Sequence, residues 1–241
     1  MSAVLLVRGD REFLCERGEE LQTDLGVLTV PEDVEPGDVV ETHLGEAFQV
    51  RRLRGPDLFH HLERSGAPMM PRDVGLVVGH LGIESADRVL DVGTGTGVLA
   101  AYLGRIGATV VTYERNAEFA DLARRNMATA GVTERVEVRT GDVLEDVGTL
   151  SGFDVLTLDT ADAPAVVEDG TDLLLPGGMV AAYSPFVEHT RRVVEAAREA
   201  GFTDVRTYET LQREMDFDER GSRPSTAGVG HTGYLTFARR T

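Results

Sequence analysis

Short runs of alternating apolar and polar residues fill the first part of the chain. They predict strands over residues 3–8, 12–15, 26–30, 38–42 and 47–52. The segments RGDRE and PEDVEPGD between them are rich in Gly, Pro and Asp, which favour turns. We therefore expect a small β-rich domain, a barrel or a sandwich, over residues 1–55. A helical linker over residues 56–70 should follow it.

From residue 71 onward the pattern changes to strands that alternate with helices. Strands are expected at 88–93, 108–114, 135–142, 153–159, 177–185, 203–211 and 231–240. Helices are expected from Pro71 onward and at 98–105, 117–130, 164–174 and 187–200. Such alternation indicates parallel strands joined by right-handed crossovers. No helix separates the last two strands, so these should pair antiparallel. Residues 71–241 are thus predicted to form an α/β, doubly wound, Rossmann-like domain with a seven-stranded sheet.

The sharpest motif is DVGTGTG over residues 91–97, where the first of these strands turns into a helix. Glycines there let the backbone approach a ligand and leave helix N–H groups directed at it. Val98 stands where a dinucleotide fingerprint would have glycine, which disfavours an NAD site. A turn that only packs the helix on the strand is the alternative.

Acidic residues follow the next three strands. Glu114 is placed to accept both hydroxyls of a ribose, and Asp142 to accept from an adenine amino group. A solvated loop acid and a helix cap are the alternatives for these two. Asp159 ends the fourth strand, where doubly wound sheets place their sites. It could take up a proton from an acceptor, or only contact a cofactor.

These features as a set resemble the class I S-adenosylmethionine-dependent methyltransferases. The resemblance places the methionine part of S-adenosyl-L-methionine at Gly93–Gly97, the ribose at Glu114 and the adenine at Asp142. The cofactor-binding residues it implies are Asp91, Gly93, Thr94, Gly95, Thr96, Gly97, Val98, Glu114, Arg115, Asp142, Val143 and Asp159.

Three further segments narrow the resemblance. These are PMMPRDVGLVVGHLGI, LDTADAP, and the ending with REM, RP and GHTGYLTFAR. With the β-rich domain they are similar to the tRNA (adenine-N1)-methyltransferases. That family implies a homotetramer that methylates adenine 58, or also 57, of tRNA, with Asp159 as the catalytic residue. The family's usual tyrosine and lysine are replaced by Met70 and Arg72, and the spacing from Asp159 to Pro164 is one residue longer.

Two alternatives stay open. One is a class I methyltransferase that acts on a corrinoid intermediate or an isoaspartyl peptide, since both groups share the glycine motif. The other is a non-catalytic RNA-binding subunit of a methyltransferase complex.

The net negative charge of the chain affects how strongly it could attract RNA over long distances. Acidic residues number 41 against 24 basic ones, all arginine, and the net charge is −17. Acidity without lysine resembles halophilic proteins, in which salt screens charge within a few ångströms. An RNA partner is therefore compatible with this charge, although long-range steering would be weak. Candidate RNA contacts, with ion pairing to carboxylates as the alternative, are Arg51, Arg52, Arg54, Arg213, Arg220 and Arg223.

The remaining signals are modest. No apolar run is long enough for a membrane span and the N-terminus lacks a basic signal region, so a cytoplasmic protein is expected. Cys15 is the single cysteine, and the adjacent His60 and His61 point apart on a helix, so no metal is expected. His231 is expected to have a packing or hydrogen-bonding role. Tyr183 and Phe186 are candidates for the wall of an acceptor pocket, or for core positions.

Overall fold

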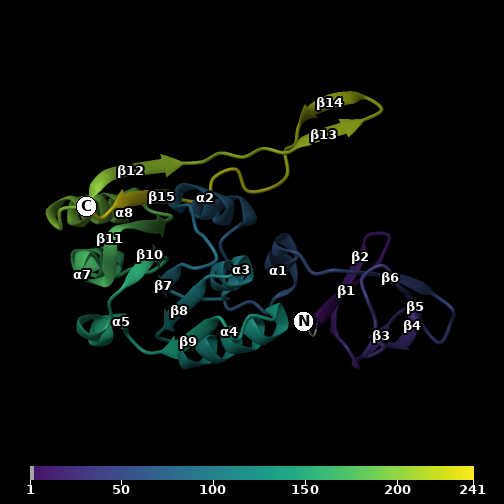
Figure 1. The fold of residues 1–241 in the computed structure, drawn as a ribbon. Coiled ribbons are helices and arrows are strands. Elements are labelled where there is room, and N and C mark those ends of the chain that lie inside the picture. Colours follow the sequence, from purple (N-terminus) through teal and green to yellow (C-terminus); the bar gives the residue numbers. More distant parts are fainter. Residues whose placement is uncertain (1–2) are drawn as a thin grey trace.

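The computed structural model describes residues 3–241, and Figure 1 shows a β-rich N-terminal region beside a larger α/β body. The N-terminal strands are β1 (Ala3–Arg8), β2 (Arg11–Glu16), β3 (Glu20–Thr23), β4 (Gly26–Thr29), β5 (Val39–Glu41) and β6 (Ala47–Arg51). They form a four-stranded sheet in the order β2-β1-β6-β5 and a separate β3-β4 hairpin. Leu6 of β1, Leu28 of β4 and Phe48 of β6 share one core, so the hairpin covers the sheet. β3 was not predicted, because its sequence ELQT has a single apolar residue.

The linker contains one short helix. α1 (Gly55–His61) begins at a proline-containing turn and buries Leu58. Residues 62–70 then run without regular structure to α2 (Pro71–Leu81), which ends at Gly82 in a left-handed conformation.

The α/β body contains the predicted seven-stranded sheet. Its strands are β7 (Arg88–Val92), β8 (Thr109–Glu114), β9 (Val136–Thr140), β10 (Phe153–Leu158), β11 (Leu174–Ser184), β12 (Thr203–Glu209) and β15 (Tyr234–Arg239). Their order is β12-β15-β11-β10-β7-β8-β9. β9, β8, β7, β10 and β11 are parallel, and β15 is antiparallel to both of its neighbours. The doubly wound fold and the antiparallel pairing of the last two strands are both confirmed.

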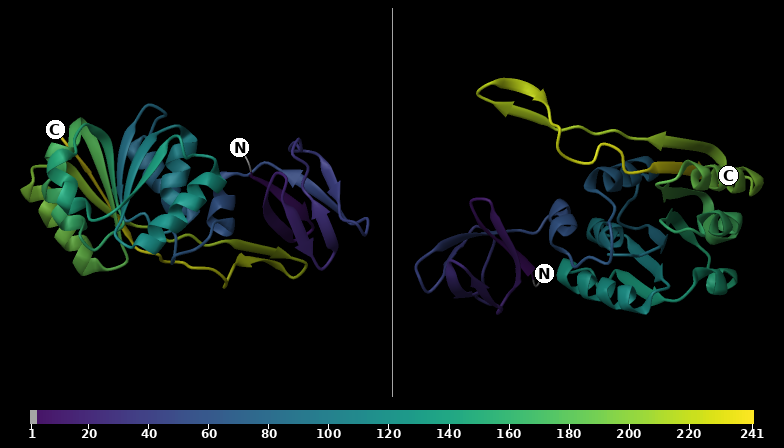
Figure 2. Two further views of the ribbon diagram at one scale, coloured as in Figure 1. Left: turned by 90° about the horizontal axis from the view of Figure 1, so that it is seen from below. Right: turned by 180° about the vertical axis from the view of Figure 1, so that it is seen from behind.

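Helices cover both faces of this sheet (Figure 2). Its helices beyond α2 are α3 (Val98–Ile106), α4 (Ala117–Ala130), α5 (Val143–Asp146), α6 (Ala163–Glu168), α7 (Gly170–Leu173) and α8 (Val187–Glu199). One core packs Val77, Leu103 and Met127 from α2, α3 and α4 against the sheet. A second core packs Val166 and Val193 from α6 and α8 against the other face. The carboxyl ends of β7, β8 and β10 therefore meet at one open edge, where such sheets bind ligands.

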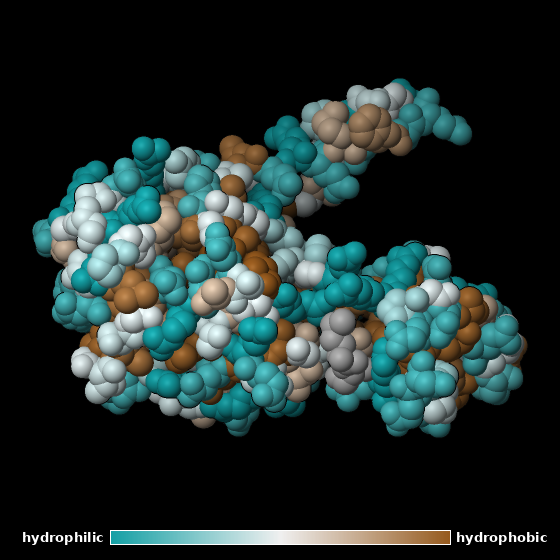
Figure 3. All heavy atoms as spheres, viewed as in Figure 1, coloured by the Kyte–Doolittle hydropathy of each residue, from teal (hydrophilic) through white to brown (hydrophobic). Residues whose placement is uncertain are grey.

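An extended arm leaves the body between β12 and β15. It carries a hairpin of β13 (Met215–Asp218) and β14 (Gly221–Pro224), which projects from the body in Figure 1. The sequence predicted a loop here, and that prediction is wrong. The strands are short and β14 has no large apolar residue, so no strand-like alternation marks them. Figure 3 shows apolar residues on the arm, where the exposed fraction reaches 77% at Phe217.

Over residues 3–241, every helix is too short or too polar to cross a lipid bilayer.

Candidate active site

The glycine motif forms the turn between β7 and α3. Gly93, Gly95 and Gly97 all adopt positive φ, at 95°, 51° and 81°. A Cβ atom on Gly93 would collide with the carbonyl oxygen of Asp159, and one on Gly97 would lie 2.6 Å from Met127 Cε. A Cβ on Gly95 would instead point into open space, with Ser65 Oγ nearest at 4.0 Å. Close packing thus requires two of the glycines, and the third leaves room beside the turn.

Asp91, just before the glycine turn, joins β7 to its two neighbouring strands. It is buried on β7, and its carboxylate accepts hydrogen bonds of 2.6 Å from the hydroxyls of Thr112 on β8 and Thr157 on β10. Burial raises the pKa of Asp91 to about 6, although the two threonine hydrogen bonds oppose the shift. The carboxylate therefore ties three neighbouring strands together at their carboxyl ends.

Glu114 ends β8 and Asp142 follows β9, and both line the same hollow. Glu114 accepts hydrogen bonds from the Gly95 N–H and the Asn116 N–H, both at 3.0 Å, so its carboxylate sits against the glycine turn. Asp142 caps α5 by accepting from the Leu144 N–H at 3.0 Å. The capping role considered for Asp142 is therefore present, and the side chain remains half-buried beside the site. Arg115 pairs with Asp162 at 2.8 Å and with Asp142 at 3.5 Å.

Asp159 lies where three hollows meet. The glycine hollow, about 50 Å³, is lined by Ala67–Met69, Asp91, Gly93–Leu99 and Asp159. The Glu114 hollow, about 150 Å³, is lined by Val92, Gly93, Tyr113–Arg115, Gly141–Val143, Asp159, Thr160 and Asp162. The Tyr183 hollow, about 260 Å³, is lined by Asp159–Ala161, Tyr183–Phe186, His189 and Arg192. The structure thus brings all the predicted site residues together around the first two hollows.

The environment of Asp159 raises the pKa of its carboxyl group. Asp159 is exposed to solvent through the hollows, although many protein atoms lie close around its carboxyl group. Poor hydration, together with the nearby charge of Asp91, raises the pKa of Asp159 to about 7. A carboxyl group with this pKa can exchange a proton at neutral pH.

A network of hydrogen bonds holds the wall of the Tyr183 hollow. The Tyr183 hydroxyl donates to the Thr232 carbonyl at 2.7 Å, and the Thr232 hydroxyl donates to Asp73 at 2.8 Å. Arg72 donates to the carbonyls of Val229 and Gly230, at 3.0 and 2.9 Å. Burial raises the pKa of Tyr183, and the charges of Asp159 and Asp73 add to the shift. The start of α2 thereby fixes the segment before β15 against the site.

A second network holds residues 62–70, which we call the strap, over the glycine turn. Asn126 of α4 is 2% exposed and donates to the carbonyls of Glu63 and Thr96, both at 2.8 Å. Its Oδ1 accepts from the Glu63 N–H at 3.1 Å, and the Ser65 N–H donates to the Thr96 hydroxyl at 3.3 Å. The sequence interpretation missed Asn126 and the strap. The nearest signal was the PMM segment, which contributes Met69 to the glycine hollow.

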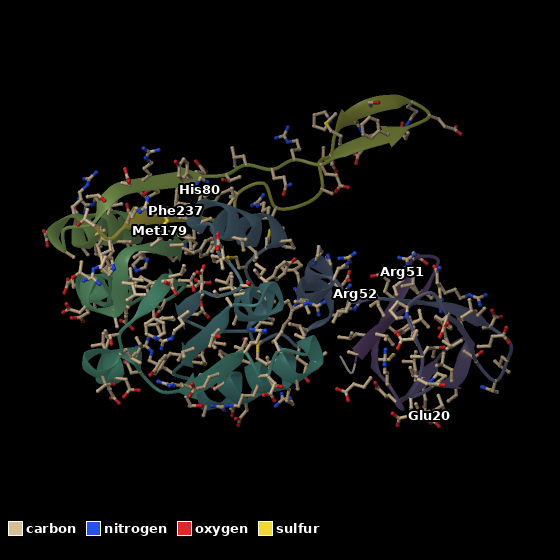
Figure 4. All side chains as sticks on the ribbon, viewed as in Figure 1. Glu20, Arg51, Arg52, His80, Met179 and Phe237 are labelled. Carbon is tan, nitrogen blue, oxygen red and sulfur yellow. The ribbon has the colours of Figure 1, made fainter. Side chains whose placement is uncertain are left out.

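Three of the candidate RNA contacts lie within ion-pair distance of a carboxylate. Arg51 lies 3.9 Å from Glu12, Arg220 lies 3.5 Å from Asp218, and Arg223 lies 3.8 Å from Asp216. Figure 4 shows Arg51 and Arg52 at the junction of the two regions.

Two of the three histidines singled out in the sequence, His61 and His231, lie beside carboxylates. His61 pairs with Glu12 at 3.3 Å and His231 pairs with Glu209 at 2.8 Å. Within residues 3–241, no cluster of three or more His, Cys, Asp or Glu side chains has a geometry suited to a metal ion. Cys15 is buried, and burial raises its thiol pKa to about 12, so the thiol is unreactive.

Residues 61–222 match the family described as "tRNA methyltransferase complex GCD14 subunit". The chain belongs to this family. It is 32% identical over 260 residues to the tRNA (adenine(57)-N(1)/adenine(58)-N(1))-methyltransferase TrmI of Methanocaldococcus jannaschii, covering 96% of this chain and 92% of that protein. It is also 32% identical over 208 residues to the tRNA (adenine(58)-N(1))-methyltransferase TrmI of Thermus thermophilus, covering 85% of this chain and 82% of that protein. The expected family resemblance is confirmed.

Solved structures give the same picture. A SAM-dependent O-methyltransferase from Thermotoga maritima superimposes with a TM-score of 0.83 and 27% identity, covering 99% of this chain and 92% of that one. The tRNA (m1A58) methyltransferase TrmI from Aquifex aeolicus superimposes with a TM-score of 0.78 and 25% identity, covering 99% and 96%. Both matches span the β-rich region as well as the α/β body.

Proposed function

We propose that this chain transfers the methyl group of S-adenosyl-L-methionine to N1 of adenine 58, or also 57, in the T-loop of tRNA. The observation that carries the proposal is the position of Asp159 where the three hollows meet. Two hollows are suited to a methionine-linked nucleoside, and the third opens beside the same carboxylate. The relatives named TrmI, which match over most of their length, support the choice of acceptor.

The residues around the first two hollows fit the cofactor. The space beside Gly95 would be filled by any side chain, and it suits the methionine part. Glu114 offers carboxylate oxygens to the ribose hydroxyls, and Asp142 offers one to the adenine amino group. Arg115, which joins Asp142 to Asp162, lies at the rim of the Glu114 hollow. Val143 is buried beside the adenine position.

We assign Asp159 a role in proton transfer. The cofactor, when bound, supplies an electrophilic methyl group on a sulfonium. Adenine N1 has an in-plane lone pair, so the reaction needs positioning and exclusion of water more than activation of the nucleophile. Methylation leaves positive charge on the ring, which is relieved when the 6-amino group loses a proton. The Asp159 carboxylate can accept a hydrogen bond from that amino group and then the proton.

The test is direct. The protein is incubated with unmodified tRNA and labelled S-adenosyl-L-methionine, the RNA is digested, and the nucleosides are separated. We expect label in 1-methyladenosine. Label in another nucleoside, or in protein only, would contradict the proposed acceptor.

The isoaspartyl alternative rests on a shorter match. A protein-L-isoaspartate O-methyltransferase of Methanoculleus marisnigri is 40% identical, but over 112 residues that cover 46% of this chain. Such a match is what a shared cofactor-binding half would give. A calorimetric titration with cofactor tests the second alternative, since a purely RNA-binding subunit should take up none.

Three further assignments complete the proposal. We propose a domain division at residues 1–55, 56–70 and 71–241, with the second segment as linker. We propose a homotetramer in which the projecting β13-β14 hairpin packs on another copy. An isolated two-stranded hairpin is at best marginally stable in water, and this one exposes Met215 and Phe217. A cytoplasmic, halophilic setting agrees with the net charge of −17 and the lack of lysine.

A further inference from the structure

The Tyr183 hollow differs in chemistry between its floor and its rim. Asp159 also lines the two hollows assigned to the cofactor, and Tyr183 is half-buried, whereas Phe186 and Arg192 are exposed and line the Tyr183 hollow. Phe186 is 68% exposed, so its ring is accessible at the mouth of the hollow. The rim therefore presents the Phe186 ring and the Arg192 guanidinium to a ligand that enters the hollow.

Arg192 stands out because of the charge of this chain. With 41 acidic and 24 basic residues, an arginine has many carboxylates available as partners. The preceding residue, Arg191, lies 3.9 Å from Glu195. Within residues 3–241 the Arg192 guanidinium makes no ion pair within 4 Å. Its positive charge is thus left facing the hollow.

Arg115 is the other arginine at the Asp159 junction, and it is already engaged. Its guanidinium contacts Asp142 and Asp162 over the Glu114 hollow. Among the described residues that line the three hollows, Arg192 is therefore the one arginine free to meet an anion on the acceptor side.

The structure holds this rim in place. His189 of α8 contacts the Ala161 carbonyl at 3.0 Å, which ties the helix carrying Arg192 to the segment after Asp159. The Phe186 N–H donates to Ser184 Oγ at 3.1 Å, and the Thr190 hydroxyl donates to the Phe186 carbonyl at 3.0 Å. The backbone under both rim residues is thereby fixed relative to Asp159.

We propose that Phe186 and Arg192 form a nucleotide-backbone subsite, which rests on the proposed function. When a base enters with its reactive edge at Asp159, its sugar-phosphate side must face the rim. Arg192 binds an adjacent phosphate through its guanidinium, and the Phe186 ring stacks on a base. The subsite selects an acceptor embedded in a polynucleotide over a free nucleoside or a protein side chain.

The test compares Arg192→Gln with Arg191→Gln, a matched change one position away. Transfer to unmodified tRNA is measured across the salt range in which each variant is folded, together with the dissociation constant of the cofactor. We expect Arg192→Gln to raise the KM for tRNA about tenfold or more, the effect of one hydrogen-bonded contact to a charged group. The slope of log affinity against log salt should fall by about 0.7 to 0.9. Cofactor affinity and kcat should be unchanged, Arg191→Gln should match the wild type, and Arg192→Lys should restore part of the loss.

Phe186 is tested separately. Phe186→Ala should weaken tRNA binding roughly fivefold or more, and Phe186→Tyr should restore it, because the tyrosine ring can still stack. An Arg192→Gln variant with the same KM and salt slope as Arg191→Gln would overturn the inference while leaving the proposed function intact. If the wild type does not methylate tRNA, the proposed function itself fails.

Discussion

Asn126 offers a perturbation whose size can be worked out from the structure. Its buried side chain makes three hydrogen bonds, two to the backbone of Glu63 and one to the Thr96 carbonyl. A typical hydrogen bond contributes about 1 kcal/mol net, so Asn126→Ala should cost about 3 kcal/mol of unfolding free energy. For a chain of this size, that corresponds to a fall in Tm of roughly 6 to 12 °C.

The neighbouring residue provides the control. Arg125 also binds Glu63, through a 2.9 Å ion pair whose side chains are 58% and 59% exposed. Exposed pairs contribute about 0 to 1 kcal/mol, so Arg125→Ala should shift Tm little. Both variants are followed by thermal and urea unfolding, with cofactor affinity measured at a temperature where each is folded. Asn126→Ala should also weaken cofactor binding, since the substitution removes the hydrogen bonds that hold the strap over the glycine turn. If the two variants are equally stable, the Asn126 hydrogen bonds do not hold the strap in place.

The other predictions concern the residues around the hollows. Glu114→Ala should raise the dissociation constant of the cofactor by about tenfold or more, because hydrogen bonds to a charged group contribute about 1.5 to 3 kcal/mol. An unaltered dissociation constant in calorimetry would show that Glu114 does not bind the ribose. Gly95→Ala should lower the free energy of unfolding by about 1 to 2 kcal/mol, because residue 95 has a positive φ. The same variant should show no measurable cofactor binding, because the added Cβ atom points into the space assigned to the methionine part. If the variant still binds the cofactor, the ligand lies elsewhere. Asp159→Ala should leave cofactor binding measurable and lower methyl transfer by roughly 10² or more. In the wild type, transfer should rise with pH through about 7, since below that pH Asp159 is protonated and cannot accept a proton; a rate that is flat from pH 5 to 9 would remove Asp159 from the chemistry.

Elements with strong local signals were predictable from the sequence. The helix expected over residues 117–130 has those bounds in the structure. The Asn116 side chain accepts from the N–H groups of Glu118 and Phe119, and Gly131 ends the helix in a left-handed conformation. Both caps are properties of the local sequence, so no tertiary contact is needed to find them.

The site was predictable to the extent that it follows from strand ends. Glu114 ends β8 and Asp159 directly follows β10, the two parallel strands that flank β7, so the topology alone brings them to the same edge. The contacts of Asn126 with Glu63 and of Tyr183 with Thr232 join residues 63 and 49 positions apart, and they depend on how the strap and the arm fold back. The pairing of Arg51, Arg220 and Arg223 with acids likewise follows from side-chain placement, which charge counts do not give.

The most direct measurement is a crystal structure of the protein with S-adenosylhomocysteine and adenosine. The account predicts the amino-acid end of the first ligand over Gly93–Gly97, its ribose hydroxyls on Glu114, and its sulfur facing the Tyr183 hollow. It predicts the adenosine base in that hollow, with its 6-amino group within hydrogen-bond distance of Asp159. An adenosine bound away from Asp159, or a first ligand that leaves the glycine turn empty, would contradict it.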